Sequence, residues 1–329
     1  MADKPKKPET LFVQSDWASL PNVHRFSHQA MATTFEIIVQ DADKLYAQQA
    51  AEAAFDEVDR IETELSRYVE NSDVTRINHA PAQQPVPLGL DTFECLKISA
   101  EIHARTGGAF DVTIGFLLDC WLNKDRTPRT PSAEELEYAR RHTGMHLLYL
   151  DEAGHTVTLA ESPVRVDLGG VGKGYGVDRM AALLREWSVD RALIHGGFSS
   201  VLALDAPEGA RGWPVTLSDP SDRRRTLVHL ALRGVAVSGS GVEKGRHIID
   251  PRPARPIEGK VAAWSVASDA ARADALSTAF MIMAPGEVET YCTEHTGVRG
   301  LLIVQDETGK GTAEHIISAG PWQDGELVY

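Results

Sequence analysis

The sequence predicts an α+β fold of largely antiparallel sheets with helices packed against them. Two observations support this prediction. Segments with the apolar patterning of strands outnumber those with helical patterning, and many of the strand segments are adjacent in the chain. Strands that follow one another directly are typical of α+β architectures.

The first half of the chain combines one strand, helices and a hairpin. Phe55, Val58 and Leu65 recur at helical spacing and form the apolar stripe of a long helix. Ser132 and Glu135 form a capping box at the start of another helix. The expected elements are a strand at 33–40, a helix at 43–68, a turn-rich loop at 65–78, helices at 91–105 and 132–142, and hairpin strands at 146–150 and 156–159.

The second half is rich in strands. Residues 164–166 are expected to form a short strand, and a glycine-rich stretch then leads into a helix at 177–187. Residues 1–25 are expected to form a loosely attached arm before a single domain of residues 26–329. The remaining expected elements are strands at 191–195, 199–204, 213–217, 226–230, 235–238, 246–250, 261–268, 300–305 and 315–319, and helices at 269–283 and 286–296.

Composition excludes some classes of function. A net charge of −14 disfavours binding to the nucleic-acid backbone, so no nucleic-acid partner is expected. The three cysteines, Cys95, Cys120 and Cys292, are far apart and predict neither a metal motif nor a disulfide framework. No long apolar segment is present, so no membrane span is expected. The polar N-terminus predicts a cytosolic protein, or an exported one whose signal has been removed.

The glycine-rich stretch of residues 165–180 is the centre of the candidate site. Glycine lets the backbone approach a ligand closely, and the N–H groups at a helix start favour an anion. Asp167 stands where a P-loop requires glycine, and Tyr175 breaks the dinucleotide fingerprint, so neither nucleotide motif fits. Lys173 favours a binding function, although such stretches also occur at purely structural junctions.

Asp274 and Thr278 form a second candidate. They are four residues apart in an expected helix, so both side chains project from one face. A carboxylate and a hydroxyl suit Mg²⁺, which takes oxygen ligands and keeps some waters. The spacing by itself favours a structural explanation, in which Thr278 bonds to the backbone one turn back and Asp274 pairs with a surface cation.

Two histidines and one aspartate complete the candidates. His247 begins an expected strand and could act as a general base or bind phosphate, or could be a satisfied polar residue at a sheet edge. His195, followed by two glycines, could line a pocket or belong to a turn. Asp111 interrupts an apolar run, and a buried carboxylate needs hydrogen-bond donors.

Taken together, these segments resemble the ApbE family of flavin transferases. The resemblance extends over almost the whole chain from Met31 onward, and its motifs occur in the same order. The motifs are Met31-Ala-Thr-Thr-Phe, Leu65-Ser-Arg-Tyr, Gly108-Ala-Phe-Asp, Asp167-Leu-Gly-Gly-Val-Gly-Lys-Gly-Tyr, His247-Ile-Ile-Asp-Pro-Arg and Ala273-Asp-Ala-Leu-Ser-Thr.

The resemblance implies an enzyme that binds FAD in a cleft between two intertwined subdomains, with Mg²⁺ at the pyrophosphate. It implies transfer of the FMN half to a threonine hydroxyl of an acceptor protein, with release of AMP. By position, His247 matches the catalytic histidine, and Asp274, Thr278 and the carbonyl of Gly170 match the metal ligands. The residues that match flavin or adenine contacts are Met31, Tyr68, Ala109, Phe110, Asp111, Asp167, Lys173 and Ile248.

The chemistry of these residue types agrees with the implied reaction. Mg²⁺ and Lys173 can stabilise the charge that grows on the leaving AMP. A threonine hydroxyl is a weak nucleophile, and His247 is the candidate for taking its proton. The Asp111 carboxylate could accept a hydrogen bond from the adenine amino group.

Two other functions use the same residues. One is an Mg²⁺-dependent FAD pyrophosphatase, in which water replaces threonine, and the other is a non-catalytic FAD-binding protein. The sequence also departs from the family pattern at Phe198-Ser199-Ser200, where an acidic or amide residue is usual, and at Val112, where proline is usual. These departures leave the expected metal and pyrophosphate residues intact and concern the acceptor side.

Overall fold

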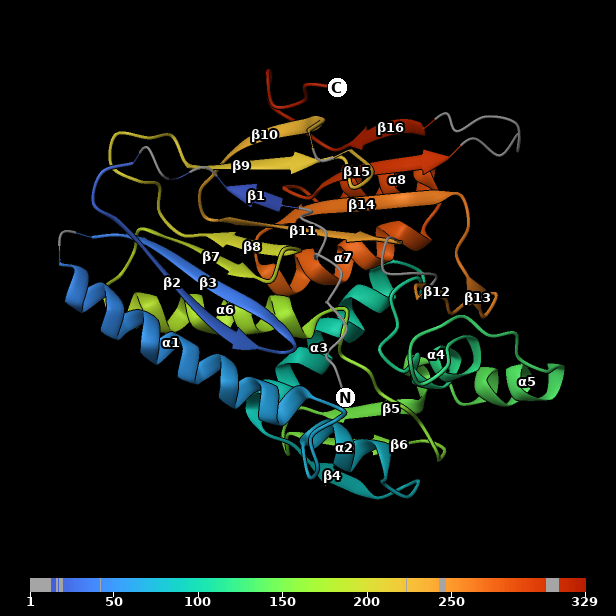
Figure 1. Cartoon of the computed structure of the whole chain (residues 1–329). Helices are drawn as coiled ribbons and strands as arrows, with labels where there is room; N and C mark the ends of the chain where they lie inside the picture. The colour runs from blue at the N-terminus through green and yellow to red at the C-terminus, as the bar shows by residue number, and fades with distance from the viewer. Residues whose placement is uncertain are drawn as a thin grey trace, which may run out of the picture.

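An eight-stranded antiparallel sheet runs through the centre of the molecule (Figure 1). The computed structural model describes residues 13–15, 17, 20–41, 43–222, 224–242, 247–305 and 314–329. The strand order is β16-β15-β14-β11-β8-β7-β3-β2, and each neighbouring pair is antiparallel. These strands are β2 (Val23–Ala30), β3 (Thr33–Gln40), β7 (Ala192–Gly196), β8 (Ser200–Ala203), β11 (Val235–Gly241), β14 (Lys260–Ala267), β15 (Arg299–Gln305) and β16 (Glu314–Ala319).

Both faces of this sheet are buried. In β7, Ala192 and Ile194 pack into a core shared with the helices, whereas Leu193 packs into a second core on the opposite face. Because side chains along a strand alternate between the two faces, a strand buried on both sides needs apolar residues at nearly every position. This explains the unbroken apolar runs of the central strands.

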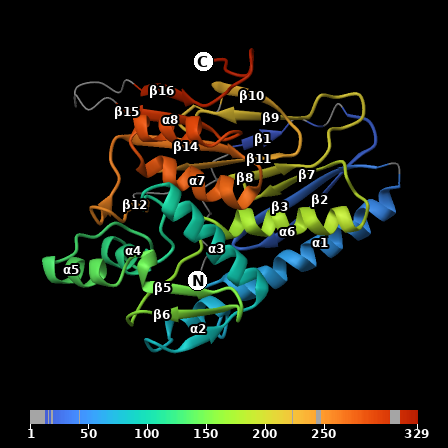
Figure 2. The same cartoon turned by 180° about the vertical axis from the view of Figure 1, so that it is seen from behind.

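Helices cover one face of the large sheet, and a small antiparallel sheet covers the other (Figures 1 and 2). The helices against the first face are α1 (Lys44–Leu65), α6 (Gly172–Glu186), α7 (Ala270–Ile282) and α8 (Pro285–Glu294). The small sheet consists of β1 (Val13–Ser15), β9 (Trp213–Ser218) and β10 (Thr226–Leu232).

Shorter elements lie beyond the helical layer, at the bottom and on the right of Figure 1. Helix α3 (Leu90–Arg105) packs against α1 and α7 and connects this region to the core. The other helices of the region are α2 (Asp73–Asn78), α4 (Gly115–Trp121) and α5 (Ala133–Arg141). The strands of the region are β4 (Pro85–Pro87), β5 (Leu148–Asp151), β6 (Thr156–Leu159), β12 (Ile249–Asp250) and β13 (Arg255–Pro256).

The predicted fold class is confirmed, and most predicted elements lie close to their expected positions. Helix α6 begins at Gly172, five residues before the expected start, because Asp274 from another helix accepts the N–H of Gly174. Residues 164–166 form no strand; Arg165 makes only an isolated bridge with Ile114.

Part of a segment that was expected to be a loop is helical, and one expected strand is shorter than predicted. Within residues 65–78, Ser72 accepts the N–H of Thr75 and caps α2, so part of this loop is a short helix. Helix α1 ends at Leu65, earlier than the expected residue 68. Of the strand expected at 246–250, only Ile249 and Asp250 pair, and residues 243–246 lie outside the described residues.

Parts of the segment expected to form an arm lie in strands. Val13–Ser15 pair with β9, and the edge strand β2 begins at Val23. Residues 1–12 lie outside the described residues, and the division into an arm and a single domain stays a prediction. Within the described part of the chain, no helix is both long and apolar enough to cross a bilayer.

His195 is buried beneath the small sheet. It is 6 % exposed, and its Nε2 lies 3.2 Å from the hydroxyl of Ser15 in β1. Burial, reinforced by the positive charge of Arg25, lowers the pKa of His195 from 6.5 to about 4. The histidine is therefore neutral in the folded protein at neutral pH, whereas the unfolded chain protonates it below pH 6.5.

We expect His195→Gln to flatten the pH dependence of stability. In the wild type, this histidine supports folding above pH 6.5, and about 3 kcal/mol of that support is lost as the pH falls to about 4. Chemical denaturation at a series of pH values measures the slope. The control His229→Gln changes an exposed histidine and should keep the wild-type slope; an unchanged slope in His195→Gln would contradict the prediction.

Candidate functional site

One cavity brings together most of the predicted site residues. It lies where the start of α6, helix α7 and the end of β11 meet the segments that follow α3 and precede β12, and its volume is about 290 Å³. Every residue that the family resemblance assigns to the site, except Met31 and Tyr68, lines it. These residues are Ala109, Phe110, Asp111, Asp167, Gly170, Lys173, His247, Ile248, Asp274 and Thr278.

A contact between α6 and α7 forms the polar centre of this cavity. Lys173 Nζ lies 3.2 Å from Oδ2 and 3.4 Å from Oδ1 of Asp274. The backbone N–H of Gly174 also donates to Asp274 Oδ2, over 3.1 Å. Asp274 is 3 % exposed, and a buried carboxylate needs such partners. The cationic partner of Asp274 is therefore Lys173, a residue of the cavity. The sequence had left open a pairing with a cation on the surface.

The space beside Gly170 suits a small cation. A Cβ at Gly170 would lie 3.4 Å from Thr278 Oγ1 and 3.2 Å from the Phe110 ring, so glycine keeps this space open. Thr278 Oγ1 lies 3.4 Å from the Asp274 carbonyl oxygen, one turn back. The described residues contain no group of three or more His, Cys, Asp or Glu side chains that could hold a metal. One carboxylate, one hydroxyl and one carbonyl, completed by water, fit Mg²⁺.

Two other carboxylates in the cavity already have protein partners. Asp111 Oδ1 accepts from the N–H and the hydroxyl of Thr113 over 2.8 and 2.6 Å, and Oδ2 accepts from the N–H of Met145 over 3.2 Å. Asp167 Oδ2 lies 3.2 Å from Nη1 of Arg67. The protein itself therefore supplies the hydrogen-bond donors that the buried Asp111 carboxylate requires. A hydrogen bond from an adenine amino group would add to these.

Met31 and Tyr68 lie outside this cavity. Met31 has a left-handed backbone conformation, with φ 49°, and packs beside Gly176 of α6. Tyr68 is 72 % exposed and lines a neighbouring cavity of about 660 Å³. Both cavities are bordered by Leu118 and Arg126, so Tyr68 faces a space next to the first cavity.

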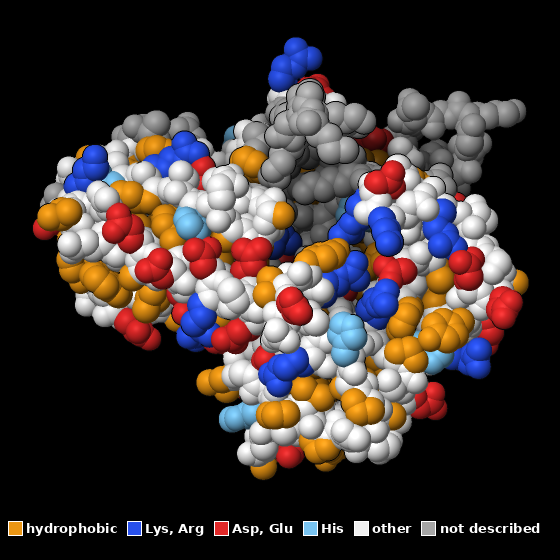
Figure 3. All heavy atoms as spheres, turned by 60° about the horizontal axis from the view of Figure 1, so that its bottom comes forward, with side chains coloured by type: hydrophobic (Ala, Val, Ile, Leu, Met, Phe, Trp, Pro, Cys, Tyr) orange, Lys and Arg blue, Asp and Glu red, His pale blue; other side chains and the backbone are white. Residues whose placement is uncertain are grey.

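The neighbouring cavity is basic, although the chain as a whole is acidic. Figure 3 shows Lys and Arg side chains gathered beside a hollow on the lower face of the molecule. Arg67 and Arg126 both donate to the Tyr68 hydroxyl, over 2.9 and 3.1 Å. Sequence reasoning missed Arg126, because it lies in a loop without a motif. The basic residues lining this cavity are Arg67, Lys124, Arg126, Arg129 and Arg165.

The two candidate histidines have different positions. His247 is half-buried and lines the first cavity, directly before the short strand β12. The adjacent Ile248 is buried. His195 lines neither of these two cavities, and its side chain lies on the opposite face of the large sheet, near Ser15.

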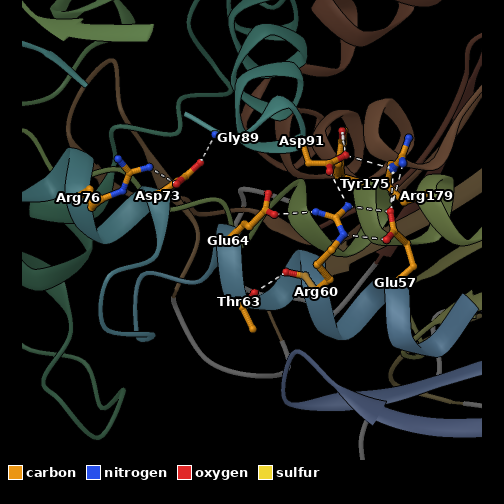
Figure 4. A network of polar contacts seen from close by, with 10 residues as sticks. All are labelled: Glu57, Arg60, Thr63, Glu64, Asp73, Arg76, Gly89, Asp91, Tyr175 and Arg179. Carbon is orange, nitrogen blue, oxygen red and sulfur yellow. Dashed lines mark hydrogen bonds and ion pairs between the residues drawn. The ribbon is translucent and has the colours of Figure 1, made fainter. Parts of the chain in front are cut away.

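An ionic network anchors α6 on its other side (Figure 4). The Tyr175 hydroxyl donates to Oδ1 of Asp91 over 2.8 Å, and Arg179 Nε lies 3.1 Å from the same oxygen. Arg60 donates to Oδ2 of Asp91 over 2.6 Å, and Glu57 bonds to both arginines. Burial and the hydrogen bond to Asp91 raise the pKa of Tyr175. The network fixes α6 to α1 and α3.

The model of the ApbE family matches residues 31–302, so the chain belongs to the ApbE family. The match includes both the glycine-rich stretch and the helix that carries Asp274 and Thr278.

Individual relatives agree with this assignment. Proteins named FAD:protein FMN transferase from Klebsiella pneumoniae and Escherichia coli K12 are each 28 % identical, over 85 % and 78 % of this chain and 84 % and 77 % of their own lengths. The crystal structure of the ApbE protein of Thermotoga maritima has a TM-score of 0.78 at 28 % identity, covering 90 % of this chain and 97 % of that one. The flavin transferase ApbE of Vibrio cholerae shares the fold, with a TM-score of 0.76 at 23 % identity and coverage of 90 % and 97 %.

The two glycines on either side of Lys173 should differ in their tolerance of alanine. A Cβ at Gly174 would lie less than 3.0 Å from backbone atoms of Ala270 and Ala271, whereas at Gly172 the nearest atom is 3.9 Å away. We expect Gly174→Ala to cost about 2 kcal/mol or more in the free energy of unfolding, because backbone atoms must move apart.

The matched control is Gly172→Ala, which should change stability by less than about 1 kcal/mol, because the added methyl group meets only ordinary contacts. Urea denaturation measures both variants. Equal losses in the two variants would show that the α6–α7 contact does not depend on the missing side chain at Gly174.

Proposed function

We propose that the protein transfers the FMN half of FAD to a threonine hydroxyl of an acceptor protein, with Mg²⁺ and with release of AMP. The observation that supports this best is the convergence of Lys173, Asp274 and His247 on one cavity. Relatives in the same family carry the name FAD:protein FMN transferase. A cation, a carboxylate and an imidazole are the groups that this transfer requires.

The proposed reaction exchanges one phosphorus–oxygen bond for another. The threonine oxygen forms a bond to the phosphorus of the FMN half, and the bond from this phosphorus to the bridging oxygen of the pyrophosphate breaks. The bridging oxygen leaves as part of the phosphate of AMP. The threonine proton passes to His247, and the FMN remains joined to the threonine through a phosphodiester.

Each cavity residue has a separate task in this reaction. Asp274, Thr278 and the carbonyl of Gly170 would hold Mg²⁺, which supplies positive charge to the pyrophosphate when bound. Lys173 adds a second positive charge at the same place and balances the negative charge on the departing AMP. His247 accepts the proton of a hydroxyl that is otherwise a weak nucleophile.

The decisive experiment measures both products. The purified protein is incubated with FAD and Mg²⁺, with a candidate acceptor protein or with its threonine-to-alanine variant. We expect flavin fluorescence to stay with the intact acceptor after denaturation, in equal amounts with released AMP. AMP and free FMN without an acceptor would indicate a pyrophosphatase, and bound FAD that never turns over would indicate a non-catalytic flavin-binding protein; either result would overturn the proposal.

Asp274→Asn should abolish Mg²⁺-dependent transfer and preserve cooperative folding. The amide keeps the size of the side chain but removes the negative charge that a divalent cation requires. We expect the rate of AMP release to fall by about 100-fold or more. Asp269→Asn, at the start of the same helix but outside the cavity, is the control; a fully active Asp274→Asn variant would exclude the metal assignment.

His247→Ala should slow the chemical step and leave FAD bound. Removal of a general base costs about 10²- to 10⁴-fold in rate. Fluorescence titration measures the FAD dissociation constant, and single-turnover AMP release measures the chemical step. Loss of FAD binding in parallel with the rate would instead assign His247 to substrate binding, and an unchanged rate would exclude it as the base.

A further inference from the structure

Helices α6 and α7 cap one another. The N–H groups of Ala270 and Ala271, the first two residues of α7, both donate to the carboxylate of Asp178 in α6, each over 2.8 Å. In the opposite direction, the N–H of Gly174 in α6 donates to Asp274 in α7 over 3.1 Å. The first N–H groups of a helix have no partner within that helix, so each helix satisfies the start of the other.

Asp178 does more than complete a helix end. Asp269 already caps α7 from its own N-cap position, by accepting the N–H of Arg272 over 2.9 Å. Val171 at the start of α6 offers no side-chain cap. The contribution specific to Asp178 is therefore a link between the two helices. It lies at the N-terminus of α7, one turn before Asp274.

The two contacts are spaced by one helical turn on each helix. Gly174 and Asp178 lie on one face of α6, and Ala270 and Asp274 lie on one face of α7. Two such contacts fix both the separation and the rotation of one helix against the other. If the first turn of α7 shifted, the carboxylate of Asp274, which lies one turn further along the helix, would shift with it.

We propose that Asp178 is a positioning residue: by holding the start of α7 against α6, it sets the place of the Asp274 carboxylate beside Lys173 and in the cavity. Asp178 does not line the cavity itself, so its effect passes through the backbone of α7. That Asp274 binds Mg²⁺ rests on the proposed function, whereas the position of its carboxylate does not.

The charge of Asp178 makes this tie sensitive to pH. Burial and the nearby Asp269 raise the pKa of Asp178 from 3.8 to about 7, while the two backbone N–H groups and Arg272 oppose this rise. The negative charge of Asp178 in turn contributes, with those of Asp274 and Asp91, to the raised pKa of the buried Cys95 thiol. Above pH 7, the carboxylate accepts both N–H groups. Below pH 7, it takes up a proton, and one of its oxygens becomes a donor.

Asp178→Asn tests the positioning role, because it keeps the size of the side chain but turns one acceptor into a donor that faces a backbone N–H. We expect the Gly174 N–H to lose about tenfold or more of its protection in amide exchange, because Asp274 moves away. Calorimetric titration with Mg²⁺ and FAD should show an affinity about 10- to 100-fold weaker, as for other residues that orient metal ligands.

The matched control is Asp269→Asn, which weakens the cap that α7 forms with its own N-cap residue. It should leave Gly174 protection and Mg²⁺ affinity within about twofold of the wild type. Wild-type protection of Gly174 in Asp178→Asn would overturn the positioning role, and so would equal losses in both variants. If the wild type binds no Mg²⁺, the proposed function fails, while amide exchange still decides the role of Asp178.

The wild type provides the same test if Asp178→Asn does not fold. Between about pH 8 and about pH 6, protonation of Asp178 should lower the protection of Ala270 and Ala271, after correction for intrinsic exchange rates. Protection of Gly174 should fall with them. Constant protection of Gly174 while the other two fall would overturn the proposal.

Discussion

The close crossing of α6 and α7 is the contact on which the cavity depends. Gly174 has no side chain, so the backbone of α6 lies directly against Ala270 at the start of α7. At this separation, Lys173 reaches Asp274, and the Gly174 N–H reaches the same carboxylate. A packed interior cannot accept an extra methyl group unless atoms move. The absence of a side chain at Gly174 therefore sets how close Lys173 and the Gly174 N–H come to Asp274.

Several buried or partly buried carboxylates in this molecule lie at helix starts or beside cations. Asp274 accepts hydrogen bonds from an N–H of α6 and from the Lys173 ammonium group. Asp178 accepts from two N–H groups of α7. Asp91 accepts from the Tyr175 hydroxyl and from Arg60. An unpaired carboxylate in such surroundings would destabilise the fold, whereas these carboxylates tie helices together. The network in Figure 4 and the α6–α7 tie therefore hold α6 from two sides, and Lys173 in its first turn lines the cavity.

The large sheet provides a rigid base for this arrangement. Small residues in β11 and β14 let α7 lie close: the Ser240 hydroxyl lies 2.8 Å from that of Ser277, and Ser265 donates to the carbonyl of Ala273. Because both faces of the sheet are buried, α7 has little freedom to move away. The basic cavity around Tyr68 has no such base, because loops and short helices form it.

Sequence alone determined the fold class, most of the long elements and most of the cavity residues. Asp274 was identifiable because it lies one turn before Thr278, so that a carboxylate and a hydroxyl share one face of a helix. Only the tertiary structure decided that the cation of Asp274 is Lys173, that Tyr68 lies in a separate cavity, and that Arg126 borders both. Periodicity describes each element by itself, but contacts between elements distant in sequence depend on how their backbones approach. That is why the start of α6, which needs a carboxylate from α7, was placed five residues too late from sequence.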